Sequence, residues 1–420
     1  MQRFAGIKND KIQVVSDRAF EHNDANIIAI PKEFDDISSS ELITNYSYRN
    51  GEFRSKFATK LAPNLRVAFV SNWHMNCGIA TYAEKLFAEI IPLVGDHRLF
   101  VEKNDGVIDS DTVIQCWKRG EYPKDLIANI KAYDPDIVAI QHEFGIWPNA
   151  RHWLSLMSQL SDYRVITTMH SVFPTHRDKT ICEAAMHEIV VHLDGAKEAL
   201  INIKQISAKV SVIPHGCDLT LNKEKLWNFY KSNHTFVQFG FGFRYKNFEH
   251  SIRTAAILRD KYKDVFLTIL FSESSAGPNA HQTYYNELMK LVNDLDLHEN
   301  VAIIRGYQSD EAANCFLQTN KVAIFPYASQ QGHAVFGASG AARSAMAANI
   351  PVITSQISHF SDLPTIKTST PEGSAEALSN LFDDAGIYRA QLLQQEQYMS
   401  THSWKNMAAR YVELFTNKKQ

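Results

Sequence analysis

Two basic residues occupy a position at which a parallel sheet can hold an anion. Arg244 and Lys246 lie in the segment GFGFRYKNFEH, between the end of an apolar run over residues 235–239 and the start of a helical pattern. Two cations at such a position suit a diphosphate, which is also stabilised by the positive end of a helix. Gly240 and Gly242 would let the backbone turn tightly beside a ligand. The alternative interpretation is two solvated charges on a surface turn.

A helix that begins with small residues is a second candidate for anion binding. In ASGAARSAMAANIPV, Ser339 is predicted to cap the helix, and Gly340 and Ala341 keep its first turn narrow. A ligand could then reach unpaired backbone N–H groups at the positive end of the helix. The alternative is a helix that only packs tightly on its sheet.

In the first half of the chain, polar residues follow predicted strands. Asn76 and Gly78 lie between the first of these strands and its helix, His142 and Glu143 follow a later strand, and His170 follows the next one. Doubly wound sheets bind ligands at the carboxyl ends of their strands, so these residues are candidates for the other wall of a binding cleft. Each single histidine is equally consistent with a structural role.

The elements that must position these residues alternate between strand and helix. Short apolar, β-branched runs predict buried parallel strands over residues 65–71, 98–103, 136–141, 164–169, 188–192 and 209–214, then over 235–240, 265–272, 301–306, 321–327 and 351–355. Amphipathic segments between most of them predict helices that cover both faces of each sheet. The predicted architecture is α/β, with two doubly wound domains facing a cleft.

The break in the alternation over residues 219–234 is interpreted as the linker between the two domains. It divides the chain into an N-terminal extension (1–63), a first domain (64–220), a second domain (221–400) and a C-terminal helix (401–420).

Composition and charge exclude several other classes of protein. The chain has 420 residues with a formal net charge of −3, which offers no electrostatic case for binding nucleic acid. Its five cysteines are scattered without a C-x-x-C pair, so neither a zinc cluster nor a disulfide framework is expected. The Asp-x-Asp segments at 109–111 and 294–296 are not interpreted as metal sites. Without a signal peptide or a run of about 18 apolar residues, a cytoplasmic protein is expected, and contact with the inner face of a membrane stays open.

A series of motifs in matching order resembles one bacterial branch of glycosyltransferase family 4, whose members are retaining, metal-independent enzymes of the GT-B fold. The motifs are NCGIATYAEKL, QHEFGIW, TTMHSVFP, VIPHGCD, FRYKNFEH, SGAARSAM and THSWKNMAARYVELF. The resemblance extends from about Leu65 to Phe415, and it is more specific as an ordered series than any single motif.

This resemblance implies two Rossmann-like domains and the transfer of a sugar from a UDP- or GDP-linked donor to a glycan or lipid-linked acceptor, as in surface polysaccharide synthesis, without cofactor or metal. The last helix would return to brace the first domain. The implied catalytic residues are His170, Arg244, Lys246 and Glu143. The implied donor-binding residues are Gly78, Gly242, Gly306, Tyr307, His333, Ser339, Gly340, Ala341 and Ser344, and the acceptor side would hold His142 and Asn76.

The chain departs from the better-known family pattern at two positions. That pattern has two glutamates with seven residues between them, which hold the donor sugar and ribose, and they align here near Phe336 and with Ser344. The Ser-Gly branch lacks them too, so the loss is interpreted as a variant. It nevertheless leaves open a non-catalytic GT-B partner subunit as an alternative. A nucleotide-sugar epimerase is a second alternative, because it can share this two-domain build. An NAD enzyme is disfavoured because neither half holds a complete G-x-G-x-x-G.

Overall fold

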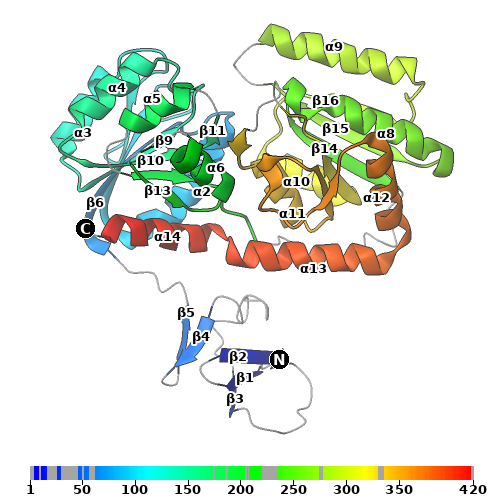
Figure 1. Ribbon diagram of the computed structural model, residues 1–420, viewed down its shortest axis with the longest axis horizontal. Coiled ribbons are helices and arrows are strands. Elements are labelled where there is room, and N and C mark those ends of the chain that lie inside the picture. Colours follow the sequence, from blue (N-terminus) through cyan, green and yellow to red (C-terminus); the bar gives the residue numbers. More distant parts are fainter. Residues whose placement is uncertain are drawn as a thin grey trace.

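The computed structural model describes residues 4–8, 11–16, 26–29, 46–49, 52–55, 62–173, 176–184, 188–203, 206, 208–219, 234–273, 278–329 and 335–417. Two α/β units lie side by side, and the two last helices run along one side of both (Figure 1). The N-terminal segments form a sheet of β1 (Phe4–Lys8), β2 (Lys11–Ser16) and β3 (Asn26–Ala29), and a hairpin of β4 (Tyr46–Arg49) and β5 (Glu52–Ser55).

The first α/β unit contains a seven-stranded parallel sheet in the order β13-β12-β10-β9-β6-β7-β8. Its strands are β6 (Ala62–Ser71), β7 (Val94–Glu102), β8 (Val113–Trp117), β9 (Ile137–His142), β10 (Arg164–Met169), β12 (Glu188–Val191) and β13 (Lys209–Val212). Its helices are α2 (Gly78–Ile90), α3 (Lys124–Tyr133), α4 (Ala150–Gln159), α5 (His176–Ala184) and α6 (Asp194–Glu198). The strand order reverses between β6 and β9, so a crevice is expected beyond their carboxyl ends.

The second α/β unit has a six-stranded parallel sheet in the order β16-β15-β14-β17-β19-β20. Its strands are β14 (Thr235–Phe241), β15 (Phe266–Ser272), β16 (Val301–Arg305), β17 (Val322–Phe325), β19 (Val352–Ser355) and β20 (Ile366–Thr368). Its helices are α8 (Phe248–Lys261), α9 (Pro278–Asp294), α10 (Asp310–Thr319), α11 (Gly340–Ala347), α12 (Pro371–Asp383) and α13 (Ala385–Thr401). Here the order reverses between β14 and β17, which brings the loop that carries Lys246 to the switch point.

The alternation of side chains along β6 shows how each sheet buries both faces. Val67 and Phe69 pack into one core cluster, whereas Ala68 and Val70 pack into another on the opposite face. The first of these clusters also contains Tyr411 from α14 (Trp404–Thr416), so the last helix packs on the first unit although it follows the second in sequence. The parallel α/β architecture predicted from the sequence is therefore confirmed.

The guanidinium of Arg164 fixes the end of α14. It donates hydrogen bonds to the carbonyls of Phe415 at 2.7 Å and Leu414 at 2.8 Å. These carbonyls have no partner within the helix, and a cation at a helix C-terminus also opposes the negative end of the dipole.

Candidate active site

A cavity of about 560 Å³ lies between the two α/β units, where the loops from the carboxyl ends of both sheets meet. The first unit contributes loops that follow β6, β9, β10 and β13, and the second contributes loops that follow β14, β16 and β17. Of the residues proposed from the sequence, the structure places nine on its walls: Gly78, Glu143, His170, Lys246, Tyr307, Ser339, Gly340, Ala341 and Ser344.

Lys246 is a half-buried residue whose ammonium lies on the wall of this cavity. Its ammonium donates a hydrogen bond to the Tyr327 hydroxyl at 2.7 Å and lies 3.9 Å from the centroid of that ring. Within the described ranges no carboxylate forms an ion pair with it. Burial therefore lowers the pKa of Lys246 to about 7, because no partner compensates the lost hydration. An anion in the cavity would supply that compensation.

Arg244 faces away from the cavity, which corrects the expectation of a two-cation site. Both of its terminal nitrogens donate to the Glu287 carboxylate at 2.7 Å, and its side chain is 61% exposed. Arg244 and Lys246 are the two ends of a single 3₁₀ turn, η5 (Arg244–Lys246), in which residues two apart point in different directions. Packing of the lysine on Tyr327 leaves the arginine at the surface.

The N-terminus of α11 lies beside Lys246. The Ser339 hydroxyl accepts a hydrogen bond from the Ala342 amide at 3.3 Å, which confirms the predicted N-cap, and it lies 3.3 Å from the Tyr327 hydroxyl. Tyr327 thus links the lysine to the start of the helix. Gly340 lies against the first unit, since a Cβ there would be in ordinary van der Waals contact with the His215 ring nitrogen Nε2, at 3.7 Å. Positive charge and a helix N-terminus converge on one wall of the cavity.

Three histidines pack around Tyr82 at the floor of the first unit. The ring centroids of His170, His192 and His215 lie 4.7, 5.1 and 5.0 Å from that of Tyr82. Burial lowers the pKa of each, so all three are neutral at physiological pH. His170 Nε2 donates to the Gln141 side-chain oxygen at 2.8 Å, which leaves Nδ1 as an acceptor. Sequence reasoning singled out only His170. The signal that could have found the others is their equivalent place after β12 and β13.

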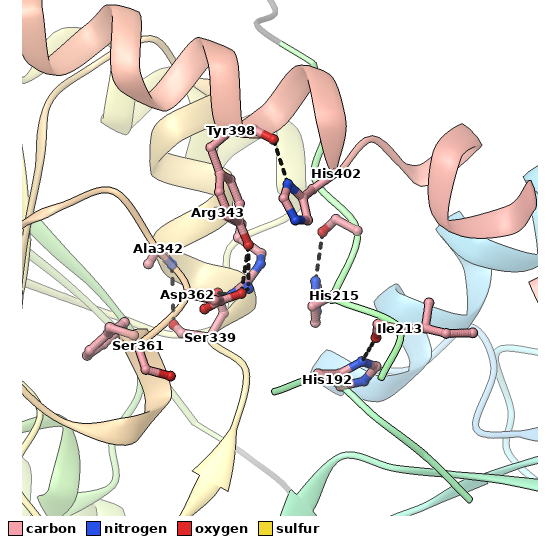
Figure 2. Close-up of polar contacts among 12 residues, drawn as sticks. His192, Ile213, His215, Ser339, Ala342, Arg343, Ser361, Asp362, Tyr398 and His402 are labelled. Atoms are coloured by element: carbon pink, nitrogen blue, oxygen red, sulfur yellow. Dashed lines mark hydrogen bonds and ion pairs between the residues drawn. The ribbon is translucent and has the colours of Figure 1, made fainter. Parts of the chain in front are cut away.

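A buried ionic group lies behind the start of α11 and was missed in the sequence. Arg343 is 2% exposed, pairs with Asp362, and donates to the Ser339 carbonyl at 3.1 Å and the Tyr398 hydroxyl at 3.2 Å. Tyr398 also donates to Asp362 at 2.6 Å. Figure 2 shows this group facing His215 and His192 of the first unit. The signal in the sequence that could have indicated this group is a single arginine within a predicted helix of mostly small residues.

Five predicted site residues do not line the cavity, and one cannot be placed. Besides Arg244, His142 is fully buried against Trp153 and Phe144, so it belongs to the core. Gly242 is required by packing, since a Cβ would lie 2.1 Å from the Phe271 ring. Gly306 has a left-handed φ of 113° and orients its neighbour Tyr307, and Asn76 is exposed beside Gly78. His333 lies outside the described residues.

Comparison with known proteins identifies the class of fold to which this two-unit arrangement belongs. The model of glycosyltransferase family 4 matches residues 114–221. The structure of HepE from Anabaena in complex with UDP and glucose has a TM-score of 0.62 and 11% identity, covering 84% of this chain and 99% of that one. The E. coli trehalose-6-phosphate structure bound with UDP-2-fluoro glucose has a TM-score of 0.65 and 11% identity, with the same coverage. The structure of trehalose-6-phosphate synthase studied with bisubstrate glycomimetics has a TM-score of 0.65 and 12% identity, again covering 84% of this chain and 99% of that one. No curated protein sequence matches.

The protein therefore has the GT-B fold, with two Rossmann-like units and an interdomain cavity. The resemblance to GT-B glycosyltransferases of family 4 is confirmed at the level of this fold and of the matched segment. Over the residues placed by the structure, no helix combines the length and apolar character needed to cross a membrane. In the same ranges, no three histidine, cysteine or acidic side chains are grouped to hold a metal ion.

Proposed function

We propose that this protein is a glycosyltransferase that moves a sugar from a UDP-sugar to a glycan or lipid-linked acceptor with retention of configuration. The observation that carries the proposal is Lys246, whose ammonium lies on the wall of the interdomain cavity with no acidic partner among the described residues. Burying such a charge costs free energy unless an anion compensates it. UDP is favoured over GDP because the HepE and E. coli structures hold uridine nucleotides. Retention of the anomeric configuration is proposed because the similar trehalose-6-phosphate synthase transfers its glycosyl group with retention.

In this proposal, the difficult step is departure of the nucleoside diphosphate from a sugar that becomes oxocarbenium-like. Negative charge then grows on the β-phosphate. Lys246 and the free amides at the start of α11 would stabilise it more strongly than they stabilise the ground state, which is the condition for catalysis. No cofactor or metal is part of the proposal.

The first unit would hold the sugar and the acceptor. Neutral His170 is suited to accept a hydrogen bond from a sugar hydroxyl through Nδ1, because its Nε2 is engaged by Gln141. Glu143 lines the same wall of the cavity and is the candidate that contacts the acceptor. Transfer in surface polysaccharide synthesis is proposed from the resemblance of the sequence motifs.

A panel of UDP- and GDP-sugars tests the proposal directly. We expect the purified chain to bind at least one UDP-sugar in the micromolar range, as is typical of enzyme substrates, and to hydrolyse it slowly without an acceptor. Proton NMR of the product formed with an acceptor reports the anomeric configuration. Binding without hydrolysis would favour the non-catalytic subunit instead, and an isomerised donor would favour the epimerase.

The affinity for UDP is expected to decrease as the pH rises above 7. In the free protein Lys246 has a pKa of about 7, so above that pH an anion binds only with uptake of a proton. The loss should approach about tenfold per pH unit. Titration calorimetry at pH 7, 8 and 9, in buffers of different ionisation enthalpy, measures both the affinity and the proton uptake. The same series on Lys246→Met should be flat, and a flat wild-type series would contradict the assignment.

Replacing Arg244 by alanine is expected to change the transfer rate less than about threefold, because its guanidinium is exposed and paired outside the cavity. Initial rates at saturating donor measure this effect. A loss approaching that of a Lys246 variant would show that Arg244 swings into the cavity when substrate binds.

A further inference from the structure

A two-stranded antiparallel sheet joins the two α/β units at the cavity. It consists of β11 (Ser171–Val172), which directly follows His170 in the first unit, and β18 (Phe336–Gly337), which shortly precedes α11 in the second. Ser171 pairs with Gly337 and Val172 pairs with Phe336. In Figure 1, β11 lies at the side of the first unit that faces the second. Backbone pairing between units is thus built into the lining of the site.

The side chains at this junction fit closely. The ring of Phe336 packs against the core cluster of the first unit and covers Gly195 of α6, where a Cβ would lie 2.7 Å from the ring carbon Cε1. Gly337 is pressed against the first unit in the same way, since a Cβ there would lie 3.0 Å from the His170 carbonyl oxygen. The Phe336 ring fits on the first unit because Gly195 has no side chain, and Gly337 approaches the first unit closely for the same reason. Both glycines therefore allow β18 to dock.

The docked strand is connected to the candidate phosphate-binding group. Ser339 follows Gly337 by two residues, lies 3.3 Å from the Tyr327 hydroxyl, and Tyr327 accepts the hydrogen bond of Lys246. On the other side, the Val335 carbonyl accepts from the Ser358 hydroxyl at 2.6 Å, which holds β18 to the second unit. A contiguous series of contacts therefore runs from the first unit to Lys246.

We propose that Phe336 is a positioning residue that docks β18 on the first unit and thereby sets the place of Ser339 and α11 beside Lys246. The inference rests on the proposed function and extends it. Ser339 and the start of α11 are then correctly placed to bind the donor only while β18 is docked on the first unit. Sugar transfer therefore depends on this docking.

Two variants disturb this contact in opposite ways. Phe336→Ala removes the ring, whereas Gly195→Ala places a methyl group against it. Gly195 lies in a helix and has no left-handed φ, so alanine there is expected to preserve or raise the stability of the fold. Leu393→Ala, an exposed change on α13, is the matched control, and Phe336→Leu tests rescue by a smaller apolar side chain.

Hydrogen–deuterium exchange of peptides covering residues 169–173 and 335–339 reports docking without any substrate. We expect protection in the unliganded wild type and in Leu393→Ala, and exchange at least about tenfold faster in Phe336→Ala and Gly195→Ala.

The transfer rate should fall about 10²-fold in both variants, as for a misplaced catalytic group. Phe336→Leu should restore part of it. The thermal unfolding midpoint of Gly195→Ala should match the wild type, which separates positioning from unfolding. The variant that carries both Phe336→Ala and Gly195→Ala should transfer sugar no more slowly than Phe336→Ala alone, because both changes break the same contact.

Unprotected amides in the wild-type segments would overturn the inference, and so would faster exchange in both variants without loss of rate. A wild type that transfers no sugar and yet protects both segments would overturn the proposed function and leave the docking contact supported.

Discussion

Replacing Lys246 by alanine is expected to lower the rate of sugar transfer by about 10²–10³-fold. The ammonium is buried in the cavity beside the start of α11, where a charge pair at 4 Å contributes about 4 kcal/mol at an effective dielectric constant of 20. Single-turnover measurements with a saturating UDP-sugar isolate the chemical step. We expect the loss mainly in that step, because the charge on the departing diphosphate is greatest in the transition state.

Controls distinguish loss of catalysis from loss of the fold. Lys246→Met keeps the volume of the side chain and removes only the charge. Because the pKa of Lys246 is lowered to about 7, the folded state disfavours its charged form, and this variant should unfold at a temperature no lower than the wild type below pH 9. Arg244→Ala, on the same turn but exposed, is the second control. A loss below threefold in Lys246→Ala would remove this residue from the mechanism.

Replacing Arg343 by alanine is expected to destabilise the second α/β unit by about 3–5 kcal/mol. Within the part of the chain that the structure describes, the change leaves Asp362 as a charge with Tyr398 as its remaining hydrogen-bond donor, and it opens a gap behind α11. Asp362 is itself largely buried, so solvent can compensate only part of the loss. Urea denaturation followed by peptide-resolved exchange measures the effect on this unit separately, since a chain with two units need not unfold in one step.

A double-mutant cycle completes the test of the buried pair. Asp362→Ala alone should also destabilise the unit, whereas Arg343→Ala combined with Asp362→Ala should cost clearly less than the sum of the two single changes. Additive effects would show that the two side chains contribute independently and that the pair does not act as a unit.

The strands and helices of both units were predictable because their signals are local. The run LRVAFVS places apolar side chains on both faces of β6, and such a pattern is stable only in a parallel sheet that helices cover on both sides. Ser339 was predictable as a helix cap for the same reason, since the capping bond joins residues three apart. The positions of Glu143 and His170 on the cavity follow from one rule, that ligands bind at the carboxyl ends of parallel strands.

The remaining site residues depended on contacts between segments that are distant in the sequence. Nothing near Arg343 indicates that Asp362 and Tyr398 enclose it. Arg244 and Lys246 are chemically similar neighbours, and only the position of Tyr327, some 80 residues later, decides which of them is buried. His142 is the last residue of β9 and His170 directly follows β10, yet Trp153 covers His142.

By itself, the sequence determined an α/β chain with two parallel sheets, a basic turn after β14 and a capped helix of small residues, because hydrophobic periodicity and capping act over a few residues. Only the tertiary structure decided which cation faces the cavity and that β18 pairs with β11 across the two units. Those outcomes depend on side-chain packing between surfaces that the chain brings together only when it folds.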